Sequence, residues 1–231
     1  MKPVKRLAWR ILMALLALLV LYQLWLFAHV CWWIKFNPAT SAFMEDRLEV
    51  MQDKDPKAGL QYKWVPYTKI SDNLKRALIA SEDAKFVDHE GFDWDGIAQA
   101  YLKNMKKGRI VAGGSTISQQ LAKNLFLSTR RTPWRKAEEA LITVMLEAVM
   151  DKQRIFEIYL NVIEWGNGVF GAEAASRHYF GVSAAQLSPE QAAMLAAMVP
   201  NPRYYDRHRE ARGMLAKTAI ILDRMPDADI P

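Results

Sequence analysis

The hydrophobic and polar positions divide the chain into an apolar N-terminal run and a longer segment with helical periodicity. No charged residue interrupts positions 11–34, a run that exceeds the roughly 20 residues a helix needs to cross a bilayer. A cleaved signal sequence has a shorter apolar core and ends in small residues, whereas this run ends in Cys31-Trp32-Trp33. We therefore predict an uncleaved membrane-spanning anchor at 11–34, after a short N-terminal segment at 1–10.

The segment after the anchor is predicted to form one mainly α-helical domain. Residues 35–70 are hydrophilic and contain proline and glycine, so we interpret them as a connector. Over residues 71–231, apolar side chains recur at three- and four-residue spacings, and alternating strand patterns are scarce. Capping residues mark three helix starts: Ser71, Thr132 followed by Pro133, and Ser188 with Gln191 three positions later. The helix from Pro133 through Met150 is apolar nearly all round beyond Ala140, so we expect it to be the central, buried helix.

The charge around the anchor predicts its orientation. Four basic residues precede the span and only Lys35 closely follows it, so the N-terminus is expected in the cytoplasm and the domain outside it. The single cysteine, Cys31, lies within the span, which excludes an intramolecular disulfide. We interpret it as a small apolar residue of the membrane helix.

A basic segment occupies the middle of the chain, whose net charge is +6. Between positions 97 and 136 there is no aspartate or glutamate, and the basic residues are Lys103, Lys106, Lys107, Arg109, Lys123, Arg130, Arg131, Arg135 and Lys136. Such a face fits anionic lipid headgroups or a phosphate-bearing substrate, and it fits nucleic acid less well in a domain outside the cytoplasm. Within it, Gly113-Gly114-Ser115-Thr116 precedes a helical stretch at 117–125. Its backbone N–H groups are candidates for an anion site, and a plain turn is the alternative interpretation.

Glu82 is the first candidate acid or base. It continues the i,i+4 series of Leu74 and Leu78, which places a carboxylate on an apolar stripe, while Asp83 points about 100° away. A carboxylate partly removed from water is suited to take or give a proton, as general acid–base catalysis requires. The alternative is a solvated glutamate at a helix end beside Lys85.

Glu139 is the second candidate, on the same side of its helix as Ile142 and Leu146. A pair with Arg135 four residues earlier is the alternative, although arginine preceding glutamate is the poorer orientation for a helical ion pair. His89 has no second His or Cys at ligand spacing, so we predict no metal site.

Five segments of the chain resemble the motifs of the peptidoglycan glycosyltransferases of glycosyltransferase family 51. The matching segments are residues 82–93, 113–124, 135–139, 152–161 and 174–181. The departures are mild: Ser118 stands where threonine is usual and Phe156 where leucine is usual. The transpeptidase signatures Ser-x-x-Lys and Lys-Thr-Gly are missing from the sequence, so the chain is most similar to the monofunctional biosynthetic peptidoglycan transglycosylases.

The resemblance implies a lysozyme-like, two-lobed helical domain and a role for each matching residue. Glu82 would deprotonate the 4-hydroxyl of the acceptor sugar. Glu139, with Lys123, Arg135 and Lys152, would lie by the donor's diphosphate, and the same pocket would be shaped by Ser115, Gln119 and Gln120. The implied reaction is inverting polymerisation of lipid II with release of undecaprenyl diphosphate. The implied setting is the periplasmic face of the bacterial inner membrane, with the membrane, the growing glycan and other cell-wall synthesis and division proteins as partners. No cofactor is expected to be required, and Mg²⁺ or Mn²⁺ at the diphosphate is left open.

Features of the sequence also suggest three other functions. A membrane-tethered lytic glycosidase could also use one acidic glutamate in a lysozyme-like fold. A module that binds anionic lipid or glycan would need the basic segment but not Glu82. Dinucleotide binding is suggested by the glycines at 166, 168 and 171, but the helical pattern before them disagrees with a βαβ unit.

Overall fold

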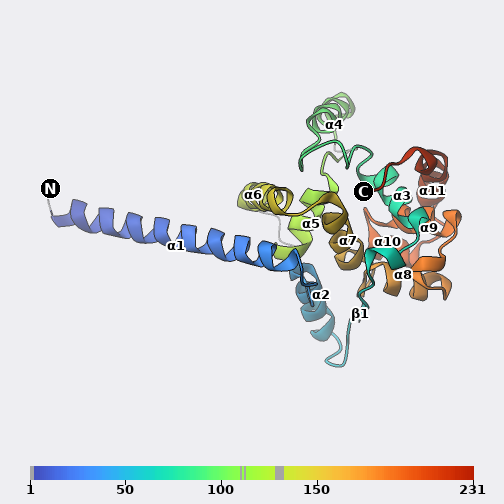
Figure 1. Ribbon diagram of the computed structural model, residues 1–231, viewed down its shortest axis with the longest axis horizontal. Coiled ribbons are helices and arrows are strands. Elements are labelled where there is room, and N and C mark those ends of the chain that lie inside the picture. The colour runs from blue at the N-terminus through green and yellow to red at the C-terminus, as the bar shows by residue number, and fades with distance from the viewer. Residues whose placement is uncertain (1–2, 110, 112, 128–132) are drawn as a thin grey trace. The chain divides into compact units, whose positions relative to one another are not determined.

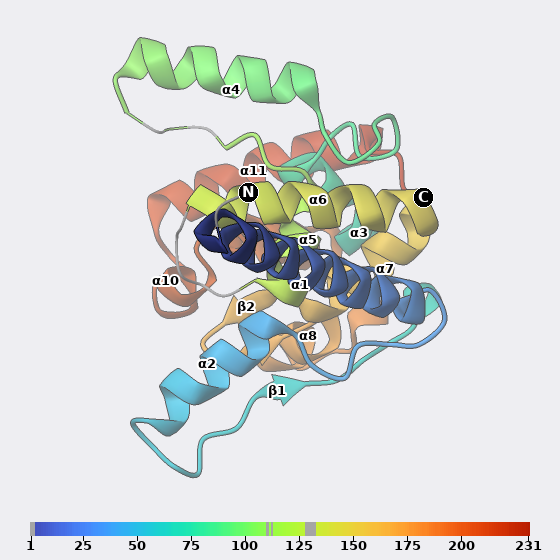
Figure 2. The same ribbon diagram turned by 90° about the vertical axis from the view of Figure 1, so that its left-hand side faces the viewer.

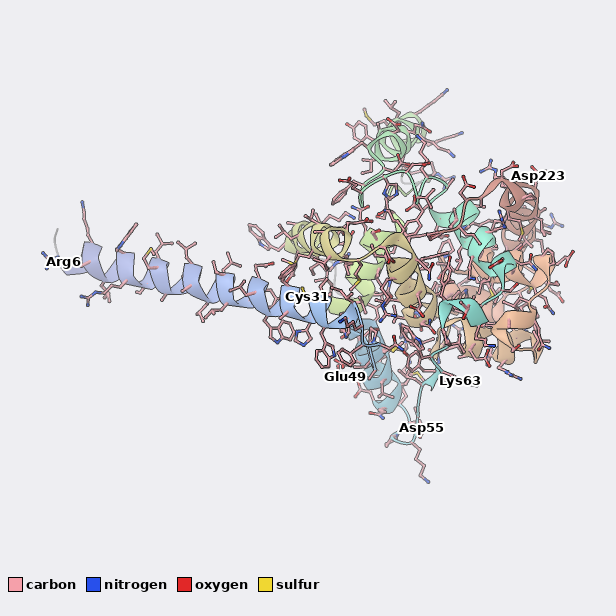
Figure 3. All side chains as sticks on the ribbon, viewed as in Figure 1. Arg6, Cys31, Glu49, Asp55, Lys63 and Asp223 are labelled. Atoms are coloured by element: carbon pink, nitrogen blue, oxygen red, sulfur yellow. The ribbon has the colours of Figure 1, made fainter. Side chains whose placement is uncertain are left out.

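The computed structural model describes residues 3–109, 111, 113–127 and 133–231, which fall into two units, Met1–Asn37 and Pro38–Pro231. The first unit is the helix α1 (Pro3–Trp33), with Arg6 near its start and Cys31 near its end (Figure 3). Over Val4–Trp33 this helix is long and apolar enough to cross a membrane. The segment expected to be the anchor therefore forms one continuous helix.

The second unit is mainly α-helical, as predicted. Its α-helices are α2 (Ala42–Gln52), α3 (Asp72–Glu82), α4 (Trp94–Lys107), α5 (Ile117–Phe126), α6 (Pro133–Val149), α7 (Lys152–Val162), α8 (Ala172–Phe180), α9 (Pro189–Met198), α10 (Pro202–Arg207) and α11 (Arg212–Arg224). Short 3₁₀ helices are η1 (Tyr67–Lys69), η2 (Ala184–Gln186) and η3 (Met225–Asp227). The predicted caps Ser71 and Ser188 begin α3 and α9, whereas Thr132, Arg130 and Arg131 lie outside the described residues.

The helices pack in two groups that meet where the candidate residues lie. In one group α3 packs against α9 and α11, and in the other α5 packs against α6, α7 and α2 (Figure 1). The helix α7 is buried over five consecutive residues, from Ile158 to Val162, whereas at most two consecutive described residues of α6 are buried. The prediction that the helix beginning at Pro133 is the central one was therefore wrong.

One face of α6 is exposed, which is why that helix is not central. Its buried side is formed by Glu139, Ile142, Thr143 and Leu146, and Met150, directly after the helix, continues the same side. On the other side, 83% of Trp134, 53% of Leu141 and 55% of Val144 are accessible. Composition alone cannot separate a helix buried all round from one whose apolar side faces a nonaqueous surrounding.

The expected connector is largely ordered structure of the second unit. Between residues 38 and 70 lie α2, the strand β1 (Gln61–Tyr62) and η1. Arg47 of α2 is buried and its Nε donates to Glu164 Oε1 at 2.9 Å, which fastens α2 to the strand β2 (Glu164–Gly166). The segment 35–70 is thus more than a tether.

A small sheet explains the glycines at 166, 168 and 171. Its order is β1-β3-β2, with β3 (Val169–Phe170) parallel to β1 and antiparallel to β2. Gly171 has φ +81°, and a Cβ there would lie 2.6 Å from the carbonyl oxygen of Asn161. These glycines therefore serve a hairpin and a close backbone approach, and the dinucleotide-binding interpretation is wrong because the hairpin is not a βαβ unit.

The helix α4 lies at the edge of the second unit in both views (Figures 1 and 2). None of its residues is buried, and Trp94, Tyr101, Leu102 and Met105 are each more than 60% accessible. Its N-cap is Asp93, and Gly108, in the left-handed conformation, ends it. A helix that is well capped at both ends but packs so little apolar surface against its own domain presents that surface outward.

Candidate functional site

Glu82 is the last residue of α3, and its carboxylate receives three donors. Gln120 Nε2 of α5 donates to Oε2 at 3.1 Å, while Ser81 Oγ at 3.0 Å and Lys217 Nζ of α11 at 3.3 Å approach Oε1. The Glu82 side chain is 10% exposed. It therefore lies at the meeting point of the two helix groups, held mostly but not wholly away from water.

A cleft of about 380 Å³ adjoins this carboxylate, and we call it the Glu82 cleft. On one side it is lined by residues 80–84 and on the other by Gly113, Gly114, Ser115 and Thr116. A Cβ at Gly114 would lie 3.0 Å from Ile97 Cα, so a side chain there would have to push the start of α4 aside. The predicted glycine loop is therefore placed opposite Glu82.

Asp83 fills the N-terminus of α5, the position at which the sequence suggested an anion site. Its Oδ2 accepts from the backbone N–H of Ile117 at 2.9 Å, and both oxygens lie within 3.1 Å of His89 Nε2. Because His89 Nδ1 accepts from the Gly91 N–H, the neutral ring carries its proton on Nε2 and donates it to Asp83. The helix end is thus occupied by a buried carboxylate of the chain itself.

Gln119 and Thr116 form the capping box of α5. Thr116 Oγ1 accepts from the Gln119 N–H at 3.2 Å, and Gln119 Oε1 accepts from the Thr116 N–H at 3.1 Å. Thr116 Oγ1 also donates to the carbonyl of Gly91 at 2.7 Å. The sequence predicted that Gln119 shapes the pocket. In the structure its side-chain amide caps the N-terminus of α5, the helix that carries the cleft residues Gln120 and Lys123.

A second cleft, of about 360 Å³, contains the predicted residues Gln120, Lys123 and Arg135 and is here called the Lys123 cleft. Its lining adds Arg47, Glu164 and Arg203, so the cleft has an excess of positive charge. Burial lowers the pKa of Lys123, an effect reinforced by Arg135 and Lys136 and opposed by the charges of Glu139 and Glu82. Gln120 connects the two clefts because it lines this one while donating to Glu82.

Glu139 is buried on α6 and forms an ion pair with Lys136, one turn earlier. Lys136 Nζ also lies 3.3 Å from Ser115 Oγ, so Ser115, Lys136 and Glu139 are linked side by side. Lys136 was not singled out among the site residues from the sequence, although it belongs to the basic segment. Its part becomes visible only when α6 is placed beside the glycine loop.

Lys152 is held away from this group. Its Nζ forms an ion pair with Glu147 Oε1 at 2.8 Å and lies 4.7 Å from the centroid of the Phe86 ring. Ser118 Oγ donates to the same Glu147 oxygen at 2.5 Å. Lys152 is not among the residues that line the two clefts, unlike Lys123 and Arg135.

The described residues contain no group of three or more His, Cys, Asp and Glu side chains arranged to hold a metal ion. What they contain is a carboxylate facing a cleft and, around Lys123 of α5, cations contributed by several helices. Such an arrangement suits proton removal at one point and charge stabilisation at another. Lys217 is a site residue that sequence reasoning missed, since it stands 135 positions after Glu82 and no local pattern links the two.

Comparison with known proteins identifies the family of the chain. The transglycosylase family model matches residues 49–226. Biosynthetic peptidoglycan transglycosylases of Methylobacillus flagellatus, Chromobacterium violaceum and Laribacter hongkongensis are 66%, 67% and 69% identical to the chain. The alignments cover 99%, 98% and 94% of this chain and 100%, 99% and 96% of those proteins. The chain therefore belongs to the transglycosylase family.

Proposed function

We propose that this chain is a peptidoglycan glycosyltransferase that polymerises lipid II into glycan strands. The observation that carries the proposal is the Glu82 carboxylate, held by three donors at a cleft and joined through Gln120 to a second, cationic cleft. The relatives that match nearly the whole chain are named as biosynthetic peptidoglycan transglycosylases, which supports the same substrate class.

In the proposed reaction Glu82 takes the proton of the acceptor's 4-hydroxyl. The freed oxygen attacks C1 of the donor sugar from the face opposite the diphosphate, and the bond between C1 and the phosphate oxygen breaks. The electron pair leaves with undecaprenyl diphosphate, so the configuration at C1 is inverted. The carboxylate is suited to the first step because it is largely shielded from water yet borders a cleft.

We propose that the Lys123 cleft receives the leaving diphosphate. Lys123 and Arg135 provide fixed positive charge where negative charge develops on the phosphate oxygens. Glu139 would act indirectly, by holding Lys136 beside Ser115. These cations supply charge compensation of the kind that Mg²⁺ or Mn²⁺ gives in other phosphate sites, so we expect a divalent ion to modulate the rate and not to be required.

The proposed site of action is the outer surface of the cytoplasmic membrane. The helix α1 supports an anchor in that membrane, where both lipid-linked substrates are also held. The exposed apolar side chains of α4, followed by Lys103, Lys106 and Lys107, suit an interface that is apolar within and anionic at its surface. Glu82, the Lys123 cleft and α4 belong to the same unit. With α4 on the membrane surface, the sugars of the substrates would reach the site while their lipid tails stay in the bilayer.

Incubation of the purified chain with lipid II in detergent, followed by gel separation of the products, tests this function. Growth of a glycan ladder supports transfer. Shortening of added polymer without growth from lipid II would instead indicate a lytic glycosidase. Binding of lipid II with neither outcome would indicate a binding module and overturn the proposal.

A further inference from the structure

A chain of two hydrogen bonds connects the buried interior to the proposed base. Tyr159 Oη of α7 donates to Gln120 Oε1 of α5 at 3.1 Å, and Gln120 Nε2 donates to Glu82 Oε2 of α3 at 3.1 Å. Tyr159 is fully buried, whereas Gln120 is partly exposed. Three helices from both packing groups thus converge on one carboxylate oxygen.

The direction of this chain follows from the chemistry at its two ends. A carboxylate accepts hydrogen bonds and cannot donate them when ionised, so the Gln120 amide must present its NH₂ group to Glu82. Its carbonyl oxygen then faces the hydroxyl of Tyr159, which donates to it. Turning the amide over would place two oxygens against each other at Glu82 and would leave the buried hydroxyl proton without this acceptor, at a cost at both ends.

Tyr159 is suited to be a permanent donor. Burial raises its pKa well above 10, and the nearby charges of Glu82 and Asp83 raise it further. The hydroxyl therefore keeps its proton throughout the pH range in which glycosyl transfer is measured. A donor that does not titrate holds the Gln120 amide in one orientation.

The Glu82 carboxylate has four lone pairs, two on each oxygen, and its donors are divided unequally between the two oxygens. Among the described residues, Oε1 is approached by both Ser81 and Lys217, whereas Oε2 is approached by Gln120 alone. Oε2 therefore keeps one lone pair for a further donor, the hydroxyl whose proton the base must take. The amide of Gln120 sets the direction in which that lone pair points.

We propose that Tyr159 is a positioning residue for the transfer reaction: through Gln120 it aims Oε2 of Glu82 at the acceptor hydroxyl. This inference rests on the proposed function, in which Glu82 is the base. It assigns the reacting oxygen as well as the residue that orients it. Tyr159 itself touches neither substrate nor the reacting atoms.

Tyr159→Phe in the full-length chain tests the proposal, with Tyr67→Phe as the matched control. Tyr67 is also buried and also packs against Phe156, but its hydroxyl donates at 2.7 Å to the backbone oxygen of Pro231 and not to Gln120 or Glu82. Losing the orientation of a reacting group typically costs up to about 100-fold in rate, so we expect kcat for lipid II polymerisation to fall about 10- to 100-fold in Tyr159→Phe. KM should change little, and Tyr67→Phe should retain wild-type kcat.

The rate–pH profile separates positioning from general loosening of the fold. The groups around Glu82 are Lys217 of α11, Lys123 and Gln120 of α5, Ser81 of α3, Asp83 directly after α3, and Tyr159 of α7. Without the Tyr159 hydroxyl the ionised carboxylate is less well held, so the acid limb of kcat should move to higher pH in Tyr159→Phe and stay in place in Tyr67→Phe. Equal profiles in both variants would overturn the proposal.

A double-mutant cycle with Gln120→Ala completes the test. If Tyr159 acts through Gln120, the double variant should be no slower than Gln120→Ala alone. Effects on kcat that multiply would overturn the proposal, as would wild-type kcat in Tyr159→Phe. Glu82→Gln, assayed alongside, distinguishes failure of the proposed function from failure of this inference. If Glu82→Gln stays active, Glu82 is not the base. If Glu82→Gln is inactive and Tyr159→Phe is fully active, Glu82 remains the base and only the role of Tyr159 is wrong.

Discussion

At the residue scale, the environment of Glu82 changes what a substitution there is expected to do. A buried carboxylate without hydrogen-bond donors costs desolvation energy, so neutralising it would leave stability unchanged or improved. In the structure the carboxylate accepts from three donors, so an amide in its place would turn one NH₂ group toward Gln120, Ser81 or Lys217. The three hydrogen-bond donors that hold the carboxylate in place for catalysis therefore also stabilise the folded protein.

Glu82→Gln is therefore expected to lower both activity and stability, to very different extents. Polymerisation should fall by roughly 10²–10⁴-fold, the contribution of general-base catalysis. The free energy of unfolding should fall by about 1 kcal/mol, the worth of a hydrogen bond that is lost or replaced by a repulsive contact. Urea unfolding and the lipid II assay measure the two effects, with the exposed Glu49→Gln of α2 as control. Near wild-type polymerisation would exclude Glu82 as the base.

Lys123 should control the alkaline side of the rate–pH profile. Its pKa is lowered, mainly by burial, so the cation proposed to hold the diphosphate is lost below the ordinary lysine value of 10.5. Lys123→Arg keeps its charge at higher pH, so its alkaline limb should move upward. Measurement of kcat against pH in the two proteins decides this, and coincident alkaline limbs would contradict it.

The same shift predicts the sign of a stability effect. The folded protein binds the Lys123 proton less tightly than the unfolded chain does, so the charged form destabilises the fold at neutral pH, and this penalty is relieved as pH rises through the folded pKa toward 10.5. Lys123→Met should therefore be at least as stable as the wild type at pH 7, and any advantage should shrink at alkaline pH. Its polymerisation should fall by about 100-fold or more.

At the element scale, the start of α5 depends on the buried carboxylate of Asp83, the residue directly after α3. Asp83 accepts the Ile117 N–H and the His89 proton, and it lies at the positive end of the α5 dipole. Asp83→Asn loses the charge and turns an amide NH₂ toward either donor. We expect the free energy of unfolding to fall by about 1–3 kcal/mol, with activity reduced because Gln120 and Lys123 stand on this helix.

The control for Asp83→Asn is Asp88→Asn, which removes a carboxylate that is exposed on the same loop. Chemical denaturation should separate the two variants clearly. Equal stability of the two would show that the contact between Asp83 and α5 contributes nothing measurable, and the account of how the site is held together would have to change.

At the scale of the whole molecule, the exposed face of α4 is expected to bind the membrane surface. Leu102→Ser with Met105→Ser removes apolar area that is already accessible in the fold, so Tm should change little. Binding of a variant lacking residues 1–35 to vesicles containing anionic lipid should weaken when both changes are added. Val50→Ser, at an exposed apolar position on α2, is the control and should not affect binding. Equal binding of all three proteins would argue against α4 as a membrane contact.

Removal of residues 1–35 should weaken polymerisation without abolishing it. The separation of the chain into Met1–Asn37 and Pro38–Pro231 indicates that the larger unit contains its own core and the candidate site. The anchor would then contribute by concentrating the enzyme where its lipid-linked substrates are held. Assays in mixed micelles at several enzyme concentrations measure this, and complete inactivity of a folded truncated protein would show that α1 takes part in the site.

Much of this protein could be predicted from the sequence because the determining interactions are local. An uncharged run defines α1, and capping residues such as Ser71 and Ser188 set helix starts through bonds that reach only two or three positions along the chain. Glu82 was recognisable because an i,i+4 series places it on the buried stripe of α3. Local rules thus located the elements and the principal candidate residue.

Tertiary structure alone decided which partners those residues have. Two of the three donors to Glu82 come from α5 and α11, and Asp83 binds a helix that begins 34 positions later. Lys152 is paired with Glu147, and neither residue lines the two clefts. The apolar sequence of α6 was likewise compatible with a central helix, and only its packing showed one exposed side. Hydrogen bonds and ion pairs form between groups a few ångströms apart in space, however far apart they are in the chain. The sequence therefore indicates which residues are candidates, and the tertiary structure determines which of them lie together in the site.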